Sequence, residues 1–184
     1  MAKDVAQVRV GPGIIYTAVL GTAFPADAET APASAWGDVG YSDAGGAFQA
    51  ERTFEDTTVE ELLSPVRTDW TAAIYRVVLL AAQFSLENLK LYFNGGTITS
   101  IGGPPQRRTY TPPSIGGDVG VALLYRFENE YGFHTDLQVP SVKSIESLDL
   151  PIRKAPNKSV VALTFKVQIP TSGEPFTFDE YVAA

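Results

Sequence analysis

VGVALLYRF, residues 119–127, places a large apolar side chain at every second position. Successive side chains of a strand point to opposite faces, so this pattern predicts a strand with one buried face. Phe133, Thr135, Leu137 and Val139 repeat the pattern after a turn at 129–132. The two stretches together predict a β-hairpin.

Strand patterns continue on both sides of this hairpin. The expected strands are 5–10, 13–20, 36–41, 72–84, 97–101, a weaker candidate at 142–150, 161–169, and an edge strand at 176–182. We expect 72–84 to be covered on both faces, since Val77 to Leu80 is continuously apolar. Trp36 is expected to anchor the core. Residues 21–35 and 106–118 carry Pro and Gly without a period, and they are expected to be loops.

One helix is expected, at about residues 85–94. The Ser85 hydroxyl can accept from the free N–H groups of its first turn. Leu86, Leu89 and Phe93 lie on one stripe, which predicts the buried face. Gly95-Gly96 is expected to end the helix in a left-handed cap.

Residues 42–71 lack a clear core periodicity, and we interpret them as a long extended arm or loop. Acidic residues gather there, at Glu51, Glu55, Asp56, Glu60 and Glu61, against the single base Arg52. Their spacing does not fit a calcium loop. We expect an acidic arm that faces solvent or a partner. Apolar Leu62, Leu63 and Val66 follow these acidic residues in the sequence.

Composition indicates a mainly β fold, a β-sandwich or open β-barrel with one short flanking helix, in a single domain spanning 1–184. Gly (16), Pro (13) and aromatic residues are common, while Met appears once. Fourteen basic and 21 acidic residues give a net charge of −7, so the sequence has no basic footprint for gripping nucleic acid. The absence of an apolar membrane-spanning run and of Cys leads us to expect folding in a cytosol, without membrane contact.

Patterns for catalysis are scarce. His134 is the only histidine, and a surface imidazole is its simplest interpretation. The sequence lacks the Gly-x-Ser-x-Gly, zinc-ligand and phosphate-loop patterns. Arg107-Arg108 is expected to be solvated. We therefore expect no enzyme activity, no cofactor and no metal.

The order of several short motifs resembles the major tail protein family of siphoviruses, the long-tailed bacteriophages. The motifs are Val8-Arg9-Val10-Gly11-Pro12-Gly13, Trp36-Gly37-Asp38-Val39-Gly40-Tyr41 leading into Gly45-Gly46, Phe54-Glu55-Asp56 with Ser64-Pro65-Val66-Arg67, Leu86-Glu87-Asn88-Leu89, and Asn94-Gly95-Gly96. They cover about the first hundred residues.

The resemblance implies a structural virion protein, a tail tube subunit that forms six-membered rings stacked into a hollow tube. DNA would pass through the lumen during genome ejection without specific binding. It further implies that the long arm contacts a neighbouring ring, and that the partners are other copies of the chain, the tape measure protein, the tail terminator and the distal tail protein. The protein would be assembled in the host bacterial cytoplasm and reside in the virion tail.

The inter-subunit contact is expected to join the acidic arm to a basic surface segment. The candidate residues are Glu51, Glu55, Asp56, Glu60, Glu61, Leu62, Leu63 and Val66 of the arm, with Arg153, Lys154 and Lys158 opposite. Two alternatives remain: a β-sandwich binding module or capsid or tail decoration protein, and a small hydrolase that depends on His134.

Overall fold

The fold is mainly β with one short helix, as the sequence predicts. The computed structural model describes residues 13–58, 64–83, 85–103, 107–128, 132–148, 160–170 and 172–181. Its elements are β1 (Ile14–Val19), β2 (Gly37–Asp38), β3 (Ser42–Thr57), β4 (Arg67–Ala81), α1 (Leu86–Tyr92), β5 (Thr97–Ile101), β6 (Arg107–Thr111), β7 (Val121–Glu128), β8 (His134–Ser144), β9 (Val161–Val167) and β10 (Thr177–Glu180). No helix in the described part of the chain is long and apolar enough to cross a membrane.

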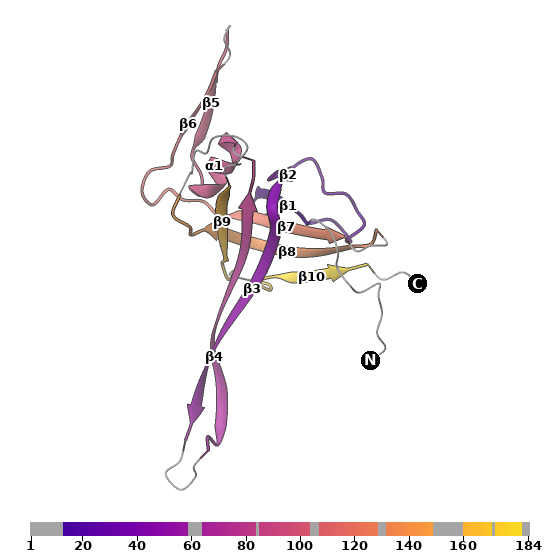
Figure 1. The fold of residues 1–184 in the computed structure, drawn as a ribbon, viewed down its shortest axis with the longest axis vertical. Helices are drawn as coiled ribbons and strands as arrows, with labels where there is room; N and C mark the ends of the chain where they lie inside the picture. The colour runs from indigo at the N-terminus through magenta and orange to yellow at the C-terminus, as the bar shows by residue number, and fades with distance from the viewer. Residues whose placement is uncertain are drawn as a thin grey trace.

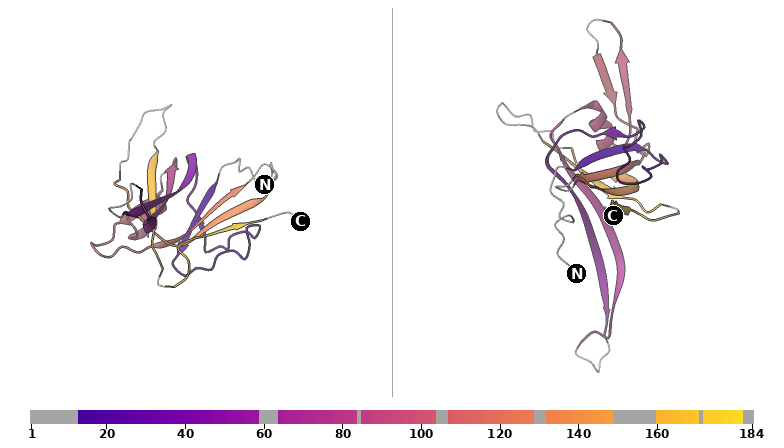
Figure 2. Two further views of the ribbon diagram at one scale, coloured as in Figure 1. Left: turned by 90° about the horizontal axis from the view of Figure 1, so that it is seen from below. Right: turned by 90° about the vertical axis from the view of Figure 1, so that its right-hand side faces the viewer.

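The large sheet is antiparallel and runs β2-β1-β7-β8-β9-β4-β3, with β10 beside β8. β8 is the strand at which this sheet divides into two leaves. Along one edge, its residues 135–138 pair with β10, and its residues 142–144 pair with β9. Pro140 lies at this switch, beside a register irregularity, where its missing N–H breaks no ladder bond. Figure 2 shows the two leaves diverging when the molecule is seen from below.

The core fills the space between the leaves. Val77 and Leu79 of β4 pack with Leu123 of β7 and Phe165 of β9, and all four are at most 2% exposed. The Tyr125 hydroxyl ties the leaves together, because it accepts from the Gly46 N–H (3.1 Å) and donates to the Gly46 carbonyl (3.0 Å). The strand expected at 119–127 is therefore present as β7, but it begins at Val121, and Ala122 and Leu124 on its other face are buried as well, so the expectation of a single buried face is wrong.

The loop 21–35 covers the outer face of the β1–β7–β8 leaf. Trp36 is 6% exposed, and its Nε1 donates to the Ala23 carbonyl at 3.0 Å. Phe24 lies against its ring, with centroids 5.1 Å apart. The expected role of Trp36 as a core anchor is therefore confirmed, although the strand expected at 36–41 is reduced to Gly37–Asp38.

The helix has the expected N-cap but a different buried face. Ser85 Oγ accepts from the Asn88 N–H at 3.0 Å. Asn88 and Tyr92 are the buried residues of α1, because Asn88 Nδ2 donates to the carbonyls of Val39 and Gln83 and the Tyr92 hydroxyl donates to Glu146. The predicted stripe of Leu86, Leu89 and Phe93 is wrong, since the packing of Tyr92 in the main core and the hydrogen bonds of Asn88 orient this helix.

The helix end also differs from the prediction in one residue. Asn94, with φ of 53°, takes the left-handed position that we expected for Gly95. The Gly95 N–H bonds to the Lys90 carbonyl and the Asn94 N–H to the Leu91 carbonyl, which is the Schellman arrangement.

The extended arm expected at 42–71 is a β-hairpin, and part of one expected loop is a strand. Residues 42–57 and 67–71 belong to the β3–β4 hairpin, which pairs from Ser42 opposite Ala81 to Thr57 opposite Arg67. Arg107–Thr111, expected within a loop, pairs with Thr97–Ile101 as β6. The candidate at 142–150 is a strand only through Ser144, as the end of β8. The expected strand at 5–10 lies outside the described residues.

The two hairpins project from the β body in opposite directions. Figure 1 shows β5–β6 at one end of the long axis and the far part of β3–β4 at the other. The second view in Figure 2 agrees. The long axis of the subunit therefore has two distinct ends.

Candidate interaction surfaces

The β3–β4 hairpin begins in the core and ends in solvent. Phe48 lies opposite Val77 near its base, where it also contacts Phe176 from the segment before β10. Farther out, Phe54 and Trp70 pair across the strands, and each is 54% exposed. An exposed aromatic pair on a projecting hairpin provides apolar contact area for a partner.

Polar contacts stiffen the outer half of this hairpin. Arg52 lies over the Trp70 ring, 5.1 Å from its centroid. The Thr68 hydroxyl donates to Asp56 Oδ1 at 2.6 Å, and Arg67 Nε contacts Asp69 at 2.6 Å. The hairpin thus stays paired beyond the body of the protein, with one register irregularity between Thr53 and Phe54.

The predicted acidic residues do not form one cluster in the described structure. Glu51 makes an ion pair with Arg76 at 2.8 Å, on the face that also carries Glu55. Asp56 faces the other way, toward Thr68. Val66 is 57% exposed at the far end. The remaining candidates, namely Glu60, Glu61, Leu62, Leu63, Arg153, Lys154 and Lys158, lie outside the described residues.

The opposite end of the molecule is basic. Arg107 and Arg108 are exposed on β6, and Arg108 forms an ion pair with Glu87 of α1. That contact lowers the pKa of the Glu87 carboxyl, chiefly through the Arg108 hydrogen bond. Lys90 is exposed on the same helix. The sequence alone did not indicate that these basic residues lie at one end of the molecule, because that placement depends on the pairing of β5 with β6.

An apolar groove of about 610 Å³ lies between α1 with the start of β5 and the ends of β1, β2 and β7. Val19 and Val119 line one side, and Leu91 and Ile98 line the other. No pattern within the sequence indicated this groove, because its lining comes from four separate stretches of the chain.

A row of cations crosses one face of the large sheet. Lys166 of β9 lies directly opposite Arg76 of β4 and Lys143 of β8. Arg76 is paired with Glu51, and Lys143 with Asp118 at 2.5 Å. Lys166 has no ion-pair partner among the described residues. Strand register alone creates this row from residues that are far apart in the sequence.

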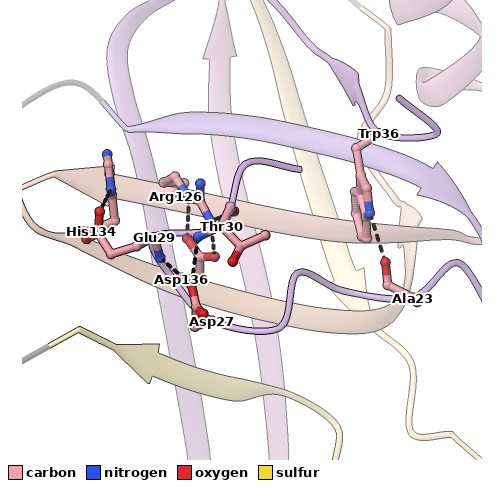
Figure 3. Close-up of polar contacts among 8 residues, drawn as sticks. All are labelled: Ala23, Asp27, Glu29, Thr30, Trp36, Arg126, His134 and Asp136. Carbon is pink, nitrogen blue, oxygen red and sulfur yellow. Dashed lines mark hydrogen bonds and ion pairs between the residues drawn. The ribbon is translucent and has the colours of Figure 1, made fainter. Parts of the chain in front are cut away.

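His134 belongs to a polar cluster that fastens the loop 21–35 (Figure 3). Glu29 accepts from the His134 backbone N–H at 2.9 Å, and its other oxygen lies 3.1 Å from Nδ1. Chiefly because of the backbone bond, the pKa of Glu29 is lowered. The contacts of His134 are thus those of a residue that holds a loop in place.

A buried ion pair lies beside His134. Arg126 contacts both oxygens of Asp136, at 2.7 and 2.6 Å, and donates to the Thr30 carbonyl at 3.0 Å. Burial raises the pKa of the Asp136 carboxyl, and the Arg126 guanidinium opposes that rise. Within the described residues, no group of three His, Cys, Asp or Glu side chains is placed to hold a metal ion.

The fold and its surfaces define a β-structured protein with two unlike ends and with exposed apolar residues on both the β3–β4 hairpin and the groove. Comparison with family models gives a match to the phage tail tube protein family over residues 1–116. The chain belongs to this family. It is accordingly a structural component of the phage tail that assembles into a tube. A search of curated proteins found no match.

Proposed function

We propose that the chain is the major tail tube subunit of a siphovirus, polymerising into stacked hexameric rings that form the hollow conduit for genome ejection. The observation that carries this proposal is the projection of the two hairpins from opposite ends of the long axis. A subunit with two unlike ends makes heterologous contacts, and such contacts repeat along a filament.

The β3–β4 hairpin is the proposed arm to the neighbouring ring. Its acidic residues would meet basic residues of another copy, with Arg153, Lys154 and Lys158 as one candidate set. The tape measure protein, the tail terminator and the distal tail protein are the further proposed partners, and assembly would take place in the host cytoplasm. The protein would catalyse nothing.

Electron microscopy of the purified protein tests the proposal. We expect hollow tubes or stacked rings for the wild type. A variant in which Asn-Gly replaces residues 52–73 joins Glu51 to Ile74, which are paired in the hairpin, by a two-residue turn. It should keep the β-sheet circular dichroism signal and form no tubes. A wild-type protein that stays monomeric under tube-forming conditions would support a decoration or binding module instead.

The single histidine permits a direct test of the non-enzymatic proposal. His134→Gln retains a side chain that can hydrogen-bond to Glu29, so we expect tube yield and phage infectivity close to wild type. A variant with normal tubes and lost infectivity would contradict this proposal.

A further inference from the structure

The groove between α1 and the sheet end is an unfilled apolar surface. Val19 is 76% exposed and Val119 is 56% exposed on one side of it. Leu20, at 42% exposure, lies beside it, with a methyl group close to Gly120 of the groove lining. Contiguous apolar surface of this kind marks a docking site for another apolar surface.

The chemistry of the groove fits side chains of a protein better than a polar small molecule. Five of its lining residues are glycines, which leave a floor of backbone without projecting groups. Its charged lining residues are Asp38, Glu87 and Lys90. Glu87 is already paired with Arg108, and Asp38 accepts from the Gly40 N–H at 2.7 Å.

A complementary surface exists at the other end of the same chain. Phe54, Val66 and Trp70 are each more than half exposed on the outer part of the β3–β4 hairpin. Residues 51–69 contain six acidic and two basic residues, whereas residues 85–111, which include α1 and the β5–β6 hairpin, contain one acidic and three basic residues. The two ends therefore match in apolar character, and the β5–β6 hairpin beside the groove carries charge opposite to that of the β3–β4 hairpin.

The length of the hairpin permits contact between copies that are displaced along the long axis. From Gly46, which is fixed to Tyr125, to Thr57, β3 spans about 36 Å at ~3.3 Å per residue. The outer part of the hairpin points away from α1, β1 and β2 of its own chain, whose residues line the groove (Figure 1). A second copy, displaced along this axis, presents its groove end to the hairpin end of the first.

We propose that the outer part of the β3–β4 hairpin of one copy docks in the groove between α1, β1 and β7 of a copy in the adjacent ring. This inference rests on the proposed stacking of rings, and it names the receptor surface for the arm. Phe54, Val66 and Trp70 supply the apolar contact, and Lys90 at the rim faces the acidic hairpin.

Engineered cysteines test the contact directly, because the chain contains none of its own. Subunits carrying Val66→Cys are mixed with subunits carrying Val119→Cys, assembled and oxidised. We expect disulfide-linked dimers of the two variants, at least tenfold more than with the matched partner Ile169→Cys. Ile169 is 80% exposed just beyond β9 and does not line the groove.

A matched pair of charge insertions gives a second readout. Val119→Asp should raise the protein concentration needed for tube formation at least tenfold, and Ile169→Asp should leave it unchanged. Both variants should unfold in urea near the wild-type midpoint, since each side chain is exposed.

The results separate this inference from the proposed function. If Val119→Asp forms tubes like wild type, or Val66→Cys links equally to both partners, the groove is not the receptor while stacking stands. If the wild type forms no tubes, the proposed function fails and this inference fails with it.

Discussion

Arg126 and Asp136 form a cross-strand ion pair between β7 and β8 that is nearly sealed from solvent, with exposures of 8% and 0%. The loop 21–35 closes over it through the Thr30 carbonyl. Removing one partner of a buried pair leaves the other charge uncompensated. Asp136→Ala should therefore destabilise the unassembled subunit by about 3–5 kcal/mol in urea unfolding.

The control for this prediction removes both charges. Arg126→Met with Asp136→Leu should cost clearly less than Asp136→Ala alone, because no unpaired charge remains. A double variant as unstable as the single one would show that packing under the loop, and not the buried charge, determines the loss.

Replacing Lys166 is expected to stabilise the fold, unlike Asp136→Ala, since Lys166 lies between two like charges. A cross-strand pair of like charges is destabilising, and an opposite-charge pair contributes roughly 0.2–1 kcal/mol. Lys166→Glu should therefore stabilise the subunit by about 0.5–1 kcal/mol, and Lys166→Gln by a smaller amount. Urea midpoints measure both. A loss of stability in Lys166→Glu would show that repulsion among the three cations of this row does not destabilise the fold.

At the scale of the element, the loop 21–35 should release from the sheet in acid. The pKa of Glu29 is lowered chiefly by the His134 backbone bond, and that of Asp27 chiefly by the Thr30 hydroxyl. A carboxyl with a lowered folded pKa stabilises the fold fully above its unfolded pKa, near 4.3 for Glu. This stabilisation is lost as the pH falls below that value and through the folded pKa.

Trp36 reports this release, because it packs on Phe24 and donates to Ala23 within the same segment. In a Trp70→Phe background its emission should shift to the red as the pH falls below about 4. Glu29→Gln should already show part of the shift at neutral pH and respond less to acid. An acid transition identical in the two proteins would exclude Glu29 as its cause.

The elements that could be predicted from the sequence are the core strands β7, β8 and β9. Each places large apolar side chains at alternate positions in the main core, so the periodicity is visible, although the opposite face of β7 is buried as well. The outer half of β3–β4 has solvent on both faces, and Arg107–Thr111 is largely polar. Neither leaves an apolar period. The buried face of α1 was missed for a different reason: Asn88 is buried with its amide bonded to the distant Val39 carbonyl, and Tyr92 packs in the main core while its hydroxyl donates to the Glu146 carbonyl.

The interaction surfaces also differ in whether the sequence could predict them. Composition alone indicated the acidic hairpin, because its acids are close together in the sequence. The groove and the cation row are made by residues from strands that are far apart along the chain, and only the sheet order brings them together. Sequence patterns are local, so they could not indicate either surface.

At the scale of the whole molecule, charge should contribute to the register between copies. Surface ion pairs contribute roughly 0–1 kcal/mol each and are screened by salt. Repetition around a ring makes their sum matter. Reversing Glu55, Asp56 and Glu60 to Lys should therefore block stacking and leave the subunit folded, with the effect largest at low salt.

Rescue experiments decide which basic residues face the arm. One set is Arg153, Lys154 and Lys158, and the other is Lys90, Arg107 and Arg108 at the groove end. Changing the correct set to Glu in the reversed-arm background should partly restore tubes, as counted by electron microscopy, because opposite charges then face each other again. The same changes in the wild-type background should weaken assembly. If the reversed arm assembles normally at low salt, or neither set rescues it, the acidic side chains are only solvated. The contact between rings then depends on the apolar surface of the hairpin.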